Sequence, residues 1–348
     1  MKINILLPYK EKFDKEKASS VSITVKNNLK HTIFLNDIKV YGQNVDTPLF
    51  KNNFIGFKYS YWSFKAKNIF LADEMTKLML QNPINAQLIE IHNRPYLVNF
   101  ISNKNKNFPI SLFLHNDPKN MKGTKSVEDR KNILKKCSAV FCVSQYIKRQ
   151  FLDGITLKNN KVHVLYNGVN KKLKKFPLKR KEVLFVGRLV PEKGVHFYVE
   201  AVKALAHKYP GWSFGLIGSF KLGDNKNRNF YSDTIIKKIR SVGPQAQFYG
   251  FKDQKFVEEK MKSASIVIIP SVWEEPFGLV AAEAMSSGAC IIASKVGGIP
   301  EIIKDNGILI DNINHKKLSL KIENLIDSDI NAEYNFKDID IPDCAKDF

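Results

Sequence analysis

Cysteine is scarce in this sequence, and long apolar runs are absent. The four cysteines are Cys137, Cys142, Cys290 and Cys344. No two of them form a C-x-x-C pair, and no histidine cluster accompanies them. We therefore expect neither a zinc site nor a disulfide framework, and interpret them as reduced, mostly buried thiols. No run approaches the roughly 18 apolar residues of a membrane helix, and M-K-I-N-I-L-L-P-Y-K is too short for a signal peptide. These absences predict a cytoplasmic protein.

Acidic residues are outnumbered by basic ones. The chain has 34 Asp and Glu against 55 Lys and Arg, a formal charge of +21. Such a field attracts phosphates, anionic lipids or nucleic acid. One interpretation is a lysine-rich bias imposed by a low-GC genome. A second is peripheral contact with the anionic inner face of the cytoplasmic membrane, where each Lys or Arg contributes about 1 kcal/mol. Nucleic acid is not expected as a partner, because no recognition motif accompanies the charge.

The length of 348 residues and the hydrophobic content of 44% predict two globular domains. Strands alternate with helices in both halves, which favours an α/β fold with parallel sheets. We expect an N-terminal domain over 1–170, a basic linker over 171–181, a C-terminal domain over 182–327 and a tail over 328–348. The linker K-K-L-K-K-F-P-L-K-R-K is interpreted as a solvated connection or as a contact to membrane phosphates. The tail could cross back to the N-terminal domain.

Apolar runs and turn residues place the main elements. We predict strands that include residues 3–8, 32–35, 39–41, 87–91, 110–114, 139–143, 161–165, 182–186, 213–217, 247–251, 266–270 and 307–310, with 297–302 completing the second sheet. Helices are predicted near residues 20–29, 64–80, 126–136, 195–208, 254–263, 277–288 and 315–326. Ser144-Gln145 is read as a turn.

Glu275 and Glu283 have seven residues between them in S-V-W-E-E-P-F-G-L-V-A-A-E-A-M, which begins at residue 271. Proline suits the start of a helix and glycine its end, so we expect a helix from just after Pro276 to Gly288. Glu275 then lies in the preceding loop, and Glu283 lies about 7 to 8 Å along the helix axis. The alternative is a solvated loop acid and an exposed helix acid with no shared role.

The start of this helix suggests a ligand. The N–H groups of Gly278 and Leu279 would have no partner within the helix and would lie at the positive end of its dipole, which favours a phosphate. A carboxylate before this site and another beyond it suit a sugar, a diphosphate and a ribose in line, because each carboxylate accepts hydrogen bonds from vicinal hydroxyls.

The segment resembles the donor-binding motif of the retaining nucleotide-sugar glycosyltransferases of family 4, similar to those of bacterial lipopolysaccharide and capsule synthesis. The resemblance implies the GT-B fold, in which two Rossmann-like doubly wound parallel-sheet domains face a cleft. It also implies that Glu275 and the backbone of Phe277, Gly278 and Leu279 hold the donor sugar and diphosphate, and that Glu283 holds the ribose.

A second motif in the C-terminal half is G-R-L-V-P-E-K-G at 187–194. It is neither a P-loop nor G-x-G-x-x-G, which excludes a Walker-type ATPase loop and a nicotinamide fingerprint here. It resembles the family's G-R-x-x-x-x-K-G element, which implies that Arg188 and Lys193 neutralise the donor diphosphate. Gly218 and Phe251 lie where family members contact the nucleotide base. Without the resemblance, Arg188 and Lys193 would be read as a surface pair.

Two strands in the N-terminal half end in histidine. His92 and His115 should face the same crevice, because carboxyl ends of parallel strands meet at one edge of a sheet. The resemblance makes His115 the candidate near the donor sugar, while His92 and Arg94 are acceptor-side candidates. Ser19 offers a hydroxyl at a helix start, beside Ala18, where the family often has glycine. Each histidine could equally cap a turn.

The predicted reaction moves a sugar from a UDP- or GDP-linked donor to a hydroxyl of a glycan or lipid-linked glycan, without metal or cofactor. His115, Arg188, Lys193 and Glu275 are the expected catalytic residues. The alternatives are a GT-B sugar phosphorylase, a nucleotide-sugar epimerase, and a non-catalytic basic module that binds carbohydrate or nucleic acid.

Overall fold

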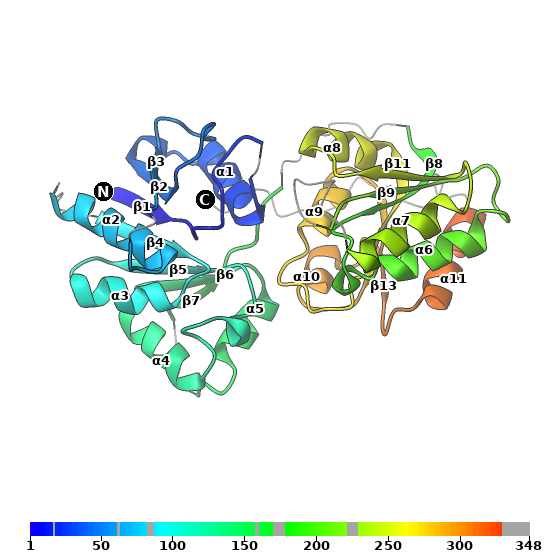
Figure 1. The fold of residues 1–348 in the computed structure, drawn as a ribbon. Coiled ribbons are helices and arrows are strands. Elements are labelled where there is room, and N and C mark those ends of the chain that lie inside the picture. The colour runs from blue at the N-terminus through cyan, green and yellow to red at the C-terminus, as the bar shows by residue number, and fades with distance from the viewer. Residues whose placement is uncertain are drawn as a thin grey trace. The chain divides into compact units, whose positions relative to one another are not determined.

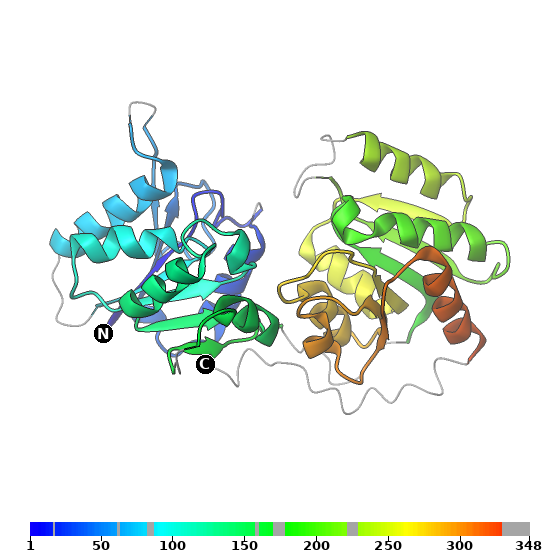
Figure 2. The ribbon, with the colours of Figure 1, turned by 90° about the horizontal axis from the view of Figure 1, so that it is seen from below.

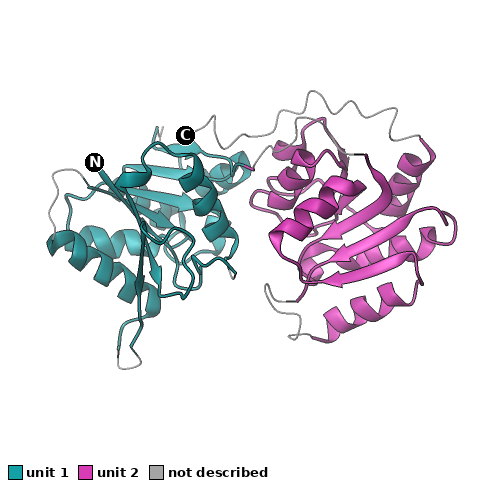
Figure 3. Ribbon diagram, turned by 90° about the horizontal axis from the view of Figure 1, so that it is seen from above, with its two compact units in different colours: residues 1–168, 344–348 teal, residues 169–343 magenta. Residues whose placement is uncertain are grey.

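The computed structural model describes residues 1–16, 18–60, 63–81, 87–156, 160–169, 178–220 and 229–328. These residues form two compact units, one up to Gly168 and one from Val169 onward, called here the N-terminal and C-terminal units (Figure 1, Figure 3). Most of the predicted linker and tail, residues 171–177 and 329–348, lies outside the described residues.

The N-terminal unit is built on a seven-stranded parallel sheet in the order β3-β2-β1-β4-β5-β6-β7. Its strands are β1 Lys2–Leu6, β2 Ile38–Gln43, β3 Phe54–Phe57, β4 Gln87–His92, β5 Ile110–Leu114, β6 Ala139–Cys142 and β7 Val162–Val164. Its helices are α1 Ser20–His31, α2 Lys67–Gln81, α3 Tyr96–Lys104, α4 Val127–Lys136 and α5 Gln145–Leu152, with short 3-10 turns at Leu35–Asp37 and Pro118–Asn120.

The C-terminal unit repeats the design with a six-stranded parallel sheet in the order β10-β9-β8-β11-β12-β13. Its strands are β8 Arg180–Val186, β9 Ser213–Ile217, β10 Ala246–Gly250, β11 Ala264–Ile269, β12 Cys290–Ser294 and β13 Ile308–Ile310. Its helices are α6 Val195–Leu205, α7 Phe230–Arg240, α8 Gln254–Ser263, α9 Leu279–Ser286, α10 Ile299–Ile303 and α11 His315–Asp327, with a 3-10 turn at Pro191–Lys193.

Helices cover both faces of each sheet (Figure 1, Figure 2). In the C-terminal unit, buried side chains of β8, β9, β11 and β12 form one core with α6, α7 and α11. The strand order reverses between β1 and β4 in one sheet and between β8 and β11 in the other. Ligands of doubly wound sheets bind at such switch points, beyond the carboxyl ends of the strands. The fold-class prediction of two Rossmann-like doubly wound units is confirmed.

Several local predictions need correction. Residues 32–35 form no strand: α1 ends at His31, and Ile33 and Phe34 are exposed instead of packing on the sheet. The short strand β3 was not predicted. Residues 297–302 do not belong to the sheet, because proline at the start of α10 favours a helix there.

Two predicted boundaries and the cysteine assignment also have clear outcomes. Ser144 caps α5 by accepting a hydrogen bond from the Ile147 N–H at 3.1 Å, so this polar pair starts a helix. Arg180 and Lys181, predicted as linker, begin β8. All three described cysteines are buried and form no disulfide with one another, and burial raises the pKa of Cys137 and Cys142 to about 12. No described helix is long and apolar enough to span a membrane.

Candidate functional site

Two loops lie side by side where the adjacent strands β8 and β11 end. The first leads through Lys193 into α6, and the second leads through Glu275 into α9. The Val272 N–H donates to the Glu192 carbonyl at 2.9 Å and ties the loops together. Gly194 permits this approach: its φ is +63°, and a Cβ there would lie 1.8 Å from the Pro270 carbonyl oxygen. The sequence thus places both motifs at the switch point of the sheet.

A buried carboxylate joins the two motifs. Lys193 Nζ forms an ion pair with Glu275 Oε1, and Ser271 Oγ donates to the same oxygen at 2.6 Å. Glu275 is only 7% exposed. Its second oxygen, Oε2, has no hydrogen-bond partner in the described part of the chain. The pair therefore presents an oriented ammonium beside a carboxylate oxygen that can accept a bond from a hydroxyl.

A glycine pair supports the Glu275 backbone from the loop after β12. The Gly298 N–H donates to the Glu275 carbonyl at 2.7 Å, and the Gly297 N–H donates to the Glu274 carboxylate. At Gly297, with φ +56°, a Cβ would lie 2.1 Å from the Glu275 carbonyl oxygen. Sequence reasoning missed Ser271 and this glycine pair as parts of the site. The Gly-Gly dipeptide was the available signal for a close backbone approach.

The start of α9 is not capped by a side chain, and its first N–H groups are the ones that the sequence predicted to be unpaired. Gly278 occupies the N-cap position with φ +102°, and no side chain caps the helix. Among the described residues, the Gly278 and Leu279 N–H groups have no hydrogen-bond partner. Unpaired N–H groups at the positive end of a helix dipole favour a phosphate. Phe277 is buried, so only its backbone could face a ligand.

Glu283 lies inside α9, as predicted. Its carboxylate has no hydrogen bond or ion pair within the described ranges, and its side chain is half-buried. Burial, together with the nearby charge of Glu258 on α8, raises the pKa of Glu283 to about 7. A partly desolvated carboxylate without a partner is a candidate acceptor for ligand hydroxyls.

The remaining predicted donor residues lie at the ends of β8, β9 and β10. Arg188 is exposed, and its guanidinium has no partner in the described chain. Gly218 links the three turns: its N–H donates to the Gly250 carbonyl at 2.9 Å, and a Cβ on it would lie 1.8 Å from the Gly187 carbonyl oxygen. Phe251 follows β10 directly and is half-buried.

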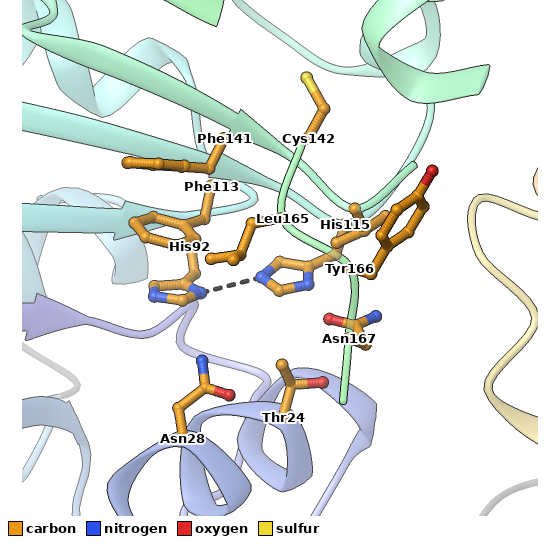
Figure 4. A pocket seen from close by; sticks show the side chains of 11 residues that line it. Thr24, Asn28, His92, Phe113, His115, Phe141, Cys142, Leu165, Tyr166 and Asn167 are labelled. Atoms are coloured by element: carbon orange, nitrogen blue, oxygen red, sulfur yellow. Dashed lines mark hydrogen bonds between the residues drawn. The ribbon is translucent and has the colours of Figure 1, made fainter. Parts of the chain in front are cut away.

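The two histidines of the N-terminal unit meet, as the strand ends predicted. His92 Nδ1 and His115 Nε2 are 2.9 Å apart, and the rings stack with centroids 5.1 Å apart (Figure 4). Burial lowers the pKa of His92 to about 3, and burial together with His92 holds the pKa of His115 well below its usual range. The pair therefore stays neutral near pH 7. It lines a pocket of about 10 Å³, room for about one water molecule.

The other two candidates of this unit have partners of their own. The guanidinium of Arg94 donates to the Asn93 carbonyl at 2.6 Å, and the side chain is half-buried. Ser19 is the N-cap residue of α1, but its hydroxyl bonds to Glu11 instead of capping the helix. The described residues contain no group of three or more His, Cys, Asp or Glu side chains that could hold a metal ion.

Family models match both units. A model of the glycosyl transferases group 1 matches residues 169–338, and a model of Glycosyltransferase Family 4 matches residues 36–173. The two halves of the chain thus each match a domain model of glycosyltransferases. The group 1 domain contains the Lys193–Glu275 pair and the start of α9, and the family 4 domain contains the histidine pair.

Relatives of this chain are found in archaea and bacteria. An uncharacterized glycosyltransferase of Methanocaldococcus jannaschii is 35% identical over 192 residues, 55% of this chain and 50% of the relative. The lipopolysaccharide 1,2-N-acetylglucosaminetransferase of Salmonella typhimurium is 28% identical over 123 residues, 35% of this chain and 32% of the relative. The chain spans about half the length of the curated relatives it matches, or less.

A solved structure shares the fold over nearly the whole chain. The Anabaena protein HepE, in complex with UDP, has a TM-score of 0.73 at 19% identity, over 99% of this chain and 94% of HepE. HepE has also been solved with UDP-glucose, with a TM-score of 0.71 over 99% of this chain and 93% of HepE.

Proposed function

We propose that this protein transfers a sugar from a nucleotide-diphosphate sugar, UDP- or GDP-linked, to a hydroxyl, with retention of anomeric configuration. The observation that carries the proposal is the joining of Lys193 and Glu275 beside the uncapped start of α9. One place thus offers a cation, unpaired N–H groups and a free carboxylate oxygen. These groups match a diphosphate linked to a sugar.

Each group has a role in the proposed donor complex. Lys193 and Arg188 neutralise the diphosphate together with the Gly278 and Leu279 N–H groups, and Glu275 Oε2 accepts a bond from a sugar hydroxyl. Glu283, half-buried and without a partner in the described chain, accepts bonds from the ribose. The turns at Gly218 and Phe251 hold the base.

The main barrier in this reaction is departure of the nucleoside diphosphate. Preorganised positive charge where negative charge develops lowers such a barrier most effectively. Arg188, Lys193 and the α9 dipole would supply that charge, and no metal has a role in the proposal. For retention, we propose that the leaving phosphate takes the acceptor proton on the face that it departs from. His115 contacts a hydroxyl of the donor sugar.

For the acceptor, we propose a glycan or lipid-linked glycan of surface polysaccharide synthesis. The Salmonella relative is named a lipopolysaccharide 1,2-N-acetylglucosaminetransferase, which supports this class. The N-terminal unit would hold the acceptor, with Ser19 and Arg94 as candidate contacts. His92, predicted as a third contact, is only 2% exposed and would act through His115. The net charge of +21 would favour a lipid-linked substrate at an anionic membrane surface.

The direct test is a panel of nucleotide sugars. We expect UDP or GDP to raise the thermal midpoint, because a ligand selective for the folded state stabilises it. One nucleotide sugar should then be hydrolysed slowly without acceptor, and NMR should show the released sugar first in the donor's anomeric configuration. If neither nucleotide stabilises the chain and DNA binds tightly in a salt-sensitive manner, the basic binding module is correct. Turnover that needs inorganic phosphate would favour a phosphorylase. A donor that stays intact while its sugar changes configuration would favour an epimerase.

A further inference from the structure

We propose that His92 is a positioning residue that fixes the tautomer of His115, with Glu90 as the group that orients His92. In this arrangement His115 presents Nδ1 to its pocket as a hydrogen-bond acceptor for a sugar hydroxyl. The inference deepens the proposed function and rests on it for the identity of that hydroxyl. The arrangement of the three side chains is a property of the N-terminal unit alone.

The three groups form a line across two neighbouring strands. Glu90 and His92 stand two residues apart on β4, so their side chains leave the same face of the sheet. Glu90 Oε2 lies 3.7 Å from His92 Nε2, and His92 Nδ1 lies 2.9 Å from His115 Nε2. His115 follows directly after the adjacent strand β5.

The surroundings hold both rings in place. His92 is 2% exposed and stacks on Phe113, with ring centroids 4.7 Å apart and planes 12° apart. The His115 backbone N–H donates to Asn93 Oδ1 at 2.9 Å, which fixes the turn that carries the ring. Thr24 of α1 and the histidine pair line the same pocket (Figure 4). The imidazoles therefore have little freedom to separate.

The number of ring protons limits which histidine donates and which accepts in this contact. Both imidazoles are neutral near pH 7, because burial lowers both pKa values. Each ring then carries one N–H, and only one proton can lie between the two facing nitrogens. His92 Nε2 is buried and has no hydrogen-bond partner in the described structure, and Glu90 Oε2 lies 3.7 Å from it.

The carboxylate selects one of the two arrangements. An ionised Glu90 favours the His92 proton on Nε2, because 3.7 Å is too long for a hydrogen bond but short enough for attraction. His92 Nδ1 then accepts from the His115 Nε2–H, and His115 Nδ1 keeps its lone pair. This nitrogen has no partner among the described residues. The reverse arrangement would present an N–H to the pocket and reject a donating hydroxyl.

The experiment uses the full chain with 15N-labelled histidine at pH 8, above the pKa of about 7 to which burial raises Glu90. Long-range 1H–15N spectra report which ring nitrogen carries the proton, whether or not the protein turns over a substrate. The variants are His92→Phe, which keeps a ring against Phe113 but loses the bond, and His92→Asn, which keeps an acceptor in place of Nδ1. His163→Phe is the matched control, since His163 packs on Phe141 and has no bond to His115.

We expect His115 to carry its proton on Nε2 in the wild type, in His92→Asn and in His163→Phe, and to become a tautomer mixture in His92→Phe. Glu90→Gln should lower the share of His92 with its proton on Nε2. The kcat of sugar transfer should fall about tenfold or more in His92→Phe, with donor KM little changed, and recover in His92→Asn.

Two spectroscopic results would overturn the proposal. One is a His115 proton on Nδ1 in the wild type, and the other is a His115 tautomer unchanged in His92→Phe. If the His92 tautomer is unchanged in Glu90→Gln, Glu90 does not orient His92. If no nucleotide sugar is turned over by the wild type, the proposed function fails, while the spectra still decide the tautomer of His115.

Discussion

Lys193 and Glu275 stand 82 positions apart in the sequence, and an ion pair joins them where the adjacent strands β8 and β11 end. The ammonium is held in place by Glu275, which also binds Ser271. A diphosphate arriving at the start of α9 would therefore meet an oriented cation, and little reorganisation is needed at the moment of reaction.

Replacing Glu275 should separate function from folding. We expect Glu275→Ala to abolish sugar transfer, by about a hundredfold or more, because the hydroxyl acceptor and the orientation of Lys193 are both lost. The protein should stay folded, since Lys193 is partly exposed and water can solvate it. Transfer rates and circular dichroism measure the two effects. The matched control is Glu259→Ala, at an exposed position of α8, which should keep most of the activity. Undiminished transfer by Glu275→Ala would refute the site.

Gly297→Ala should damage the site from the loop behind it. The added Cβ would meet the Glu275 backbone, and the positive φ of Gly297 disfavours any side chain. We expect a loss of about 1–3 kcal/mol of stability together with weaker nucleotide binding. Thermal unfolding with and without UDP measures both. Gly211→Ala is the control, because a Cβ there meets no atom within 4 Å. Equal behaviour of the two variants would contradict the support assigned to Gly297.

Glu283 should lower the free energy of unfolding while it strengthens binding of the nucleotide sugar. Its pKa is about 7 in the folded protein against 4.5 for an unperturbed glutamate. Between these values the folded protein keeps a proton that the unfolded chain releases, so this group's contribution to stability falls as pH rises through that window. At pH 8, Glu283→Gln should raise the free energy of unfolding by about 1–2 kcal/mol.

The same substitution should weaken binding of the nucleotide sugar, because Glu283 is the proposed ribose ligand. Wild-type binding should weaken as pH falls below about 7, where Glu283 takes up its proton. Thermal midpoints and titrations at pH 6 and pH 8 measure both effects. A variant less stable than the wild type at pH 8, with unchanged affinity, would show that Glu283 is a structural residue.

Much of the fold could be predicted from local pattern. Apolar runs such as A-S-I-V-I-I in β11 are buried along their whole length, as parallel strands require, and the pattern marks them clearly. Residues 32–35 misled the same reasoning, because Ile33 and Phe34 are apolar but exposed. Composition alone cannot tell an apolar residue on the surface from one in a strand.

The motifs supplied the candidate residues of the site but not the contacts between them. The motifs placed Arg188, Lys193 and Glu275 at strand ends, yet nothing in the sequence paired Lys193 with Glu275 or aligned Glu90 with the two histidines. Such contacts depend on which strands are neighbours in the sheet, and on loop geometry set by glycines far away in the chain. Because β8 and β11 are neighbours in one sheet, Lys193 meets Glu275. Because β4 and β5 are neighbours in the other, Glu90 and His92 lie beside His115.

Nucleotide binding by arginine variants tests the central claim most directly. Arg188 and Arg180 are both exposed, but Arg188 lies just beyond the carboxyl end of β8 and Arg180 begins the same strand. Titration calorimetry should detect UDP or GDP binding to the wild type. Arg188→Ala should weaken it about tenfold or more through loss of a charge-assisted contact, while Arg180→Ala should leave it unchanged. Absence of binding by both nucleotides, or equal loss in the two variants, would contradict the account.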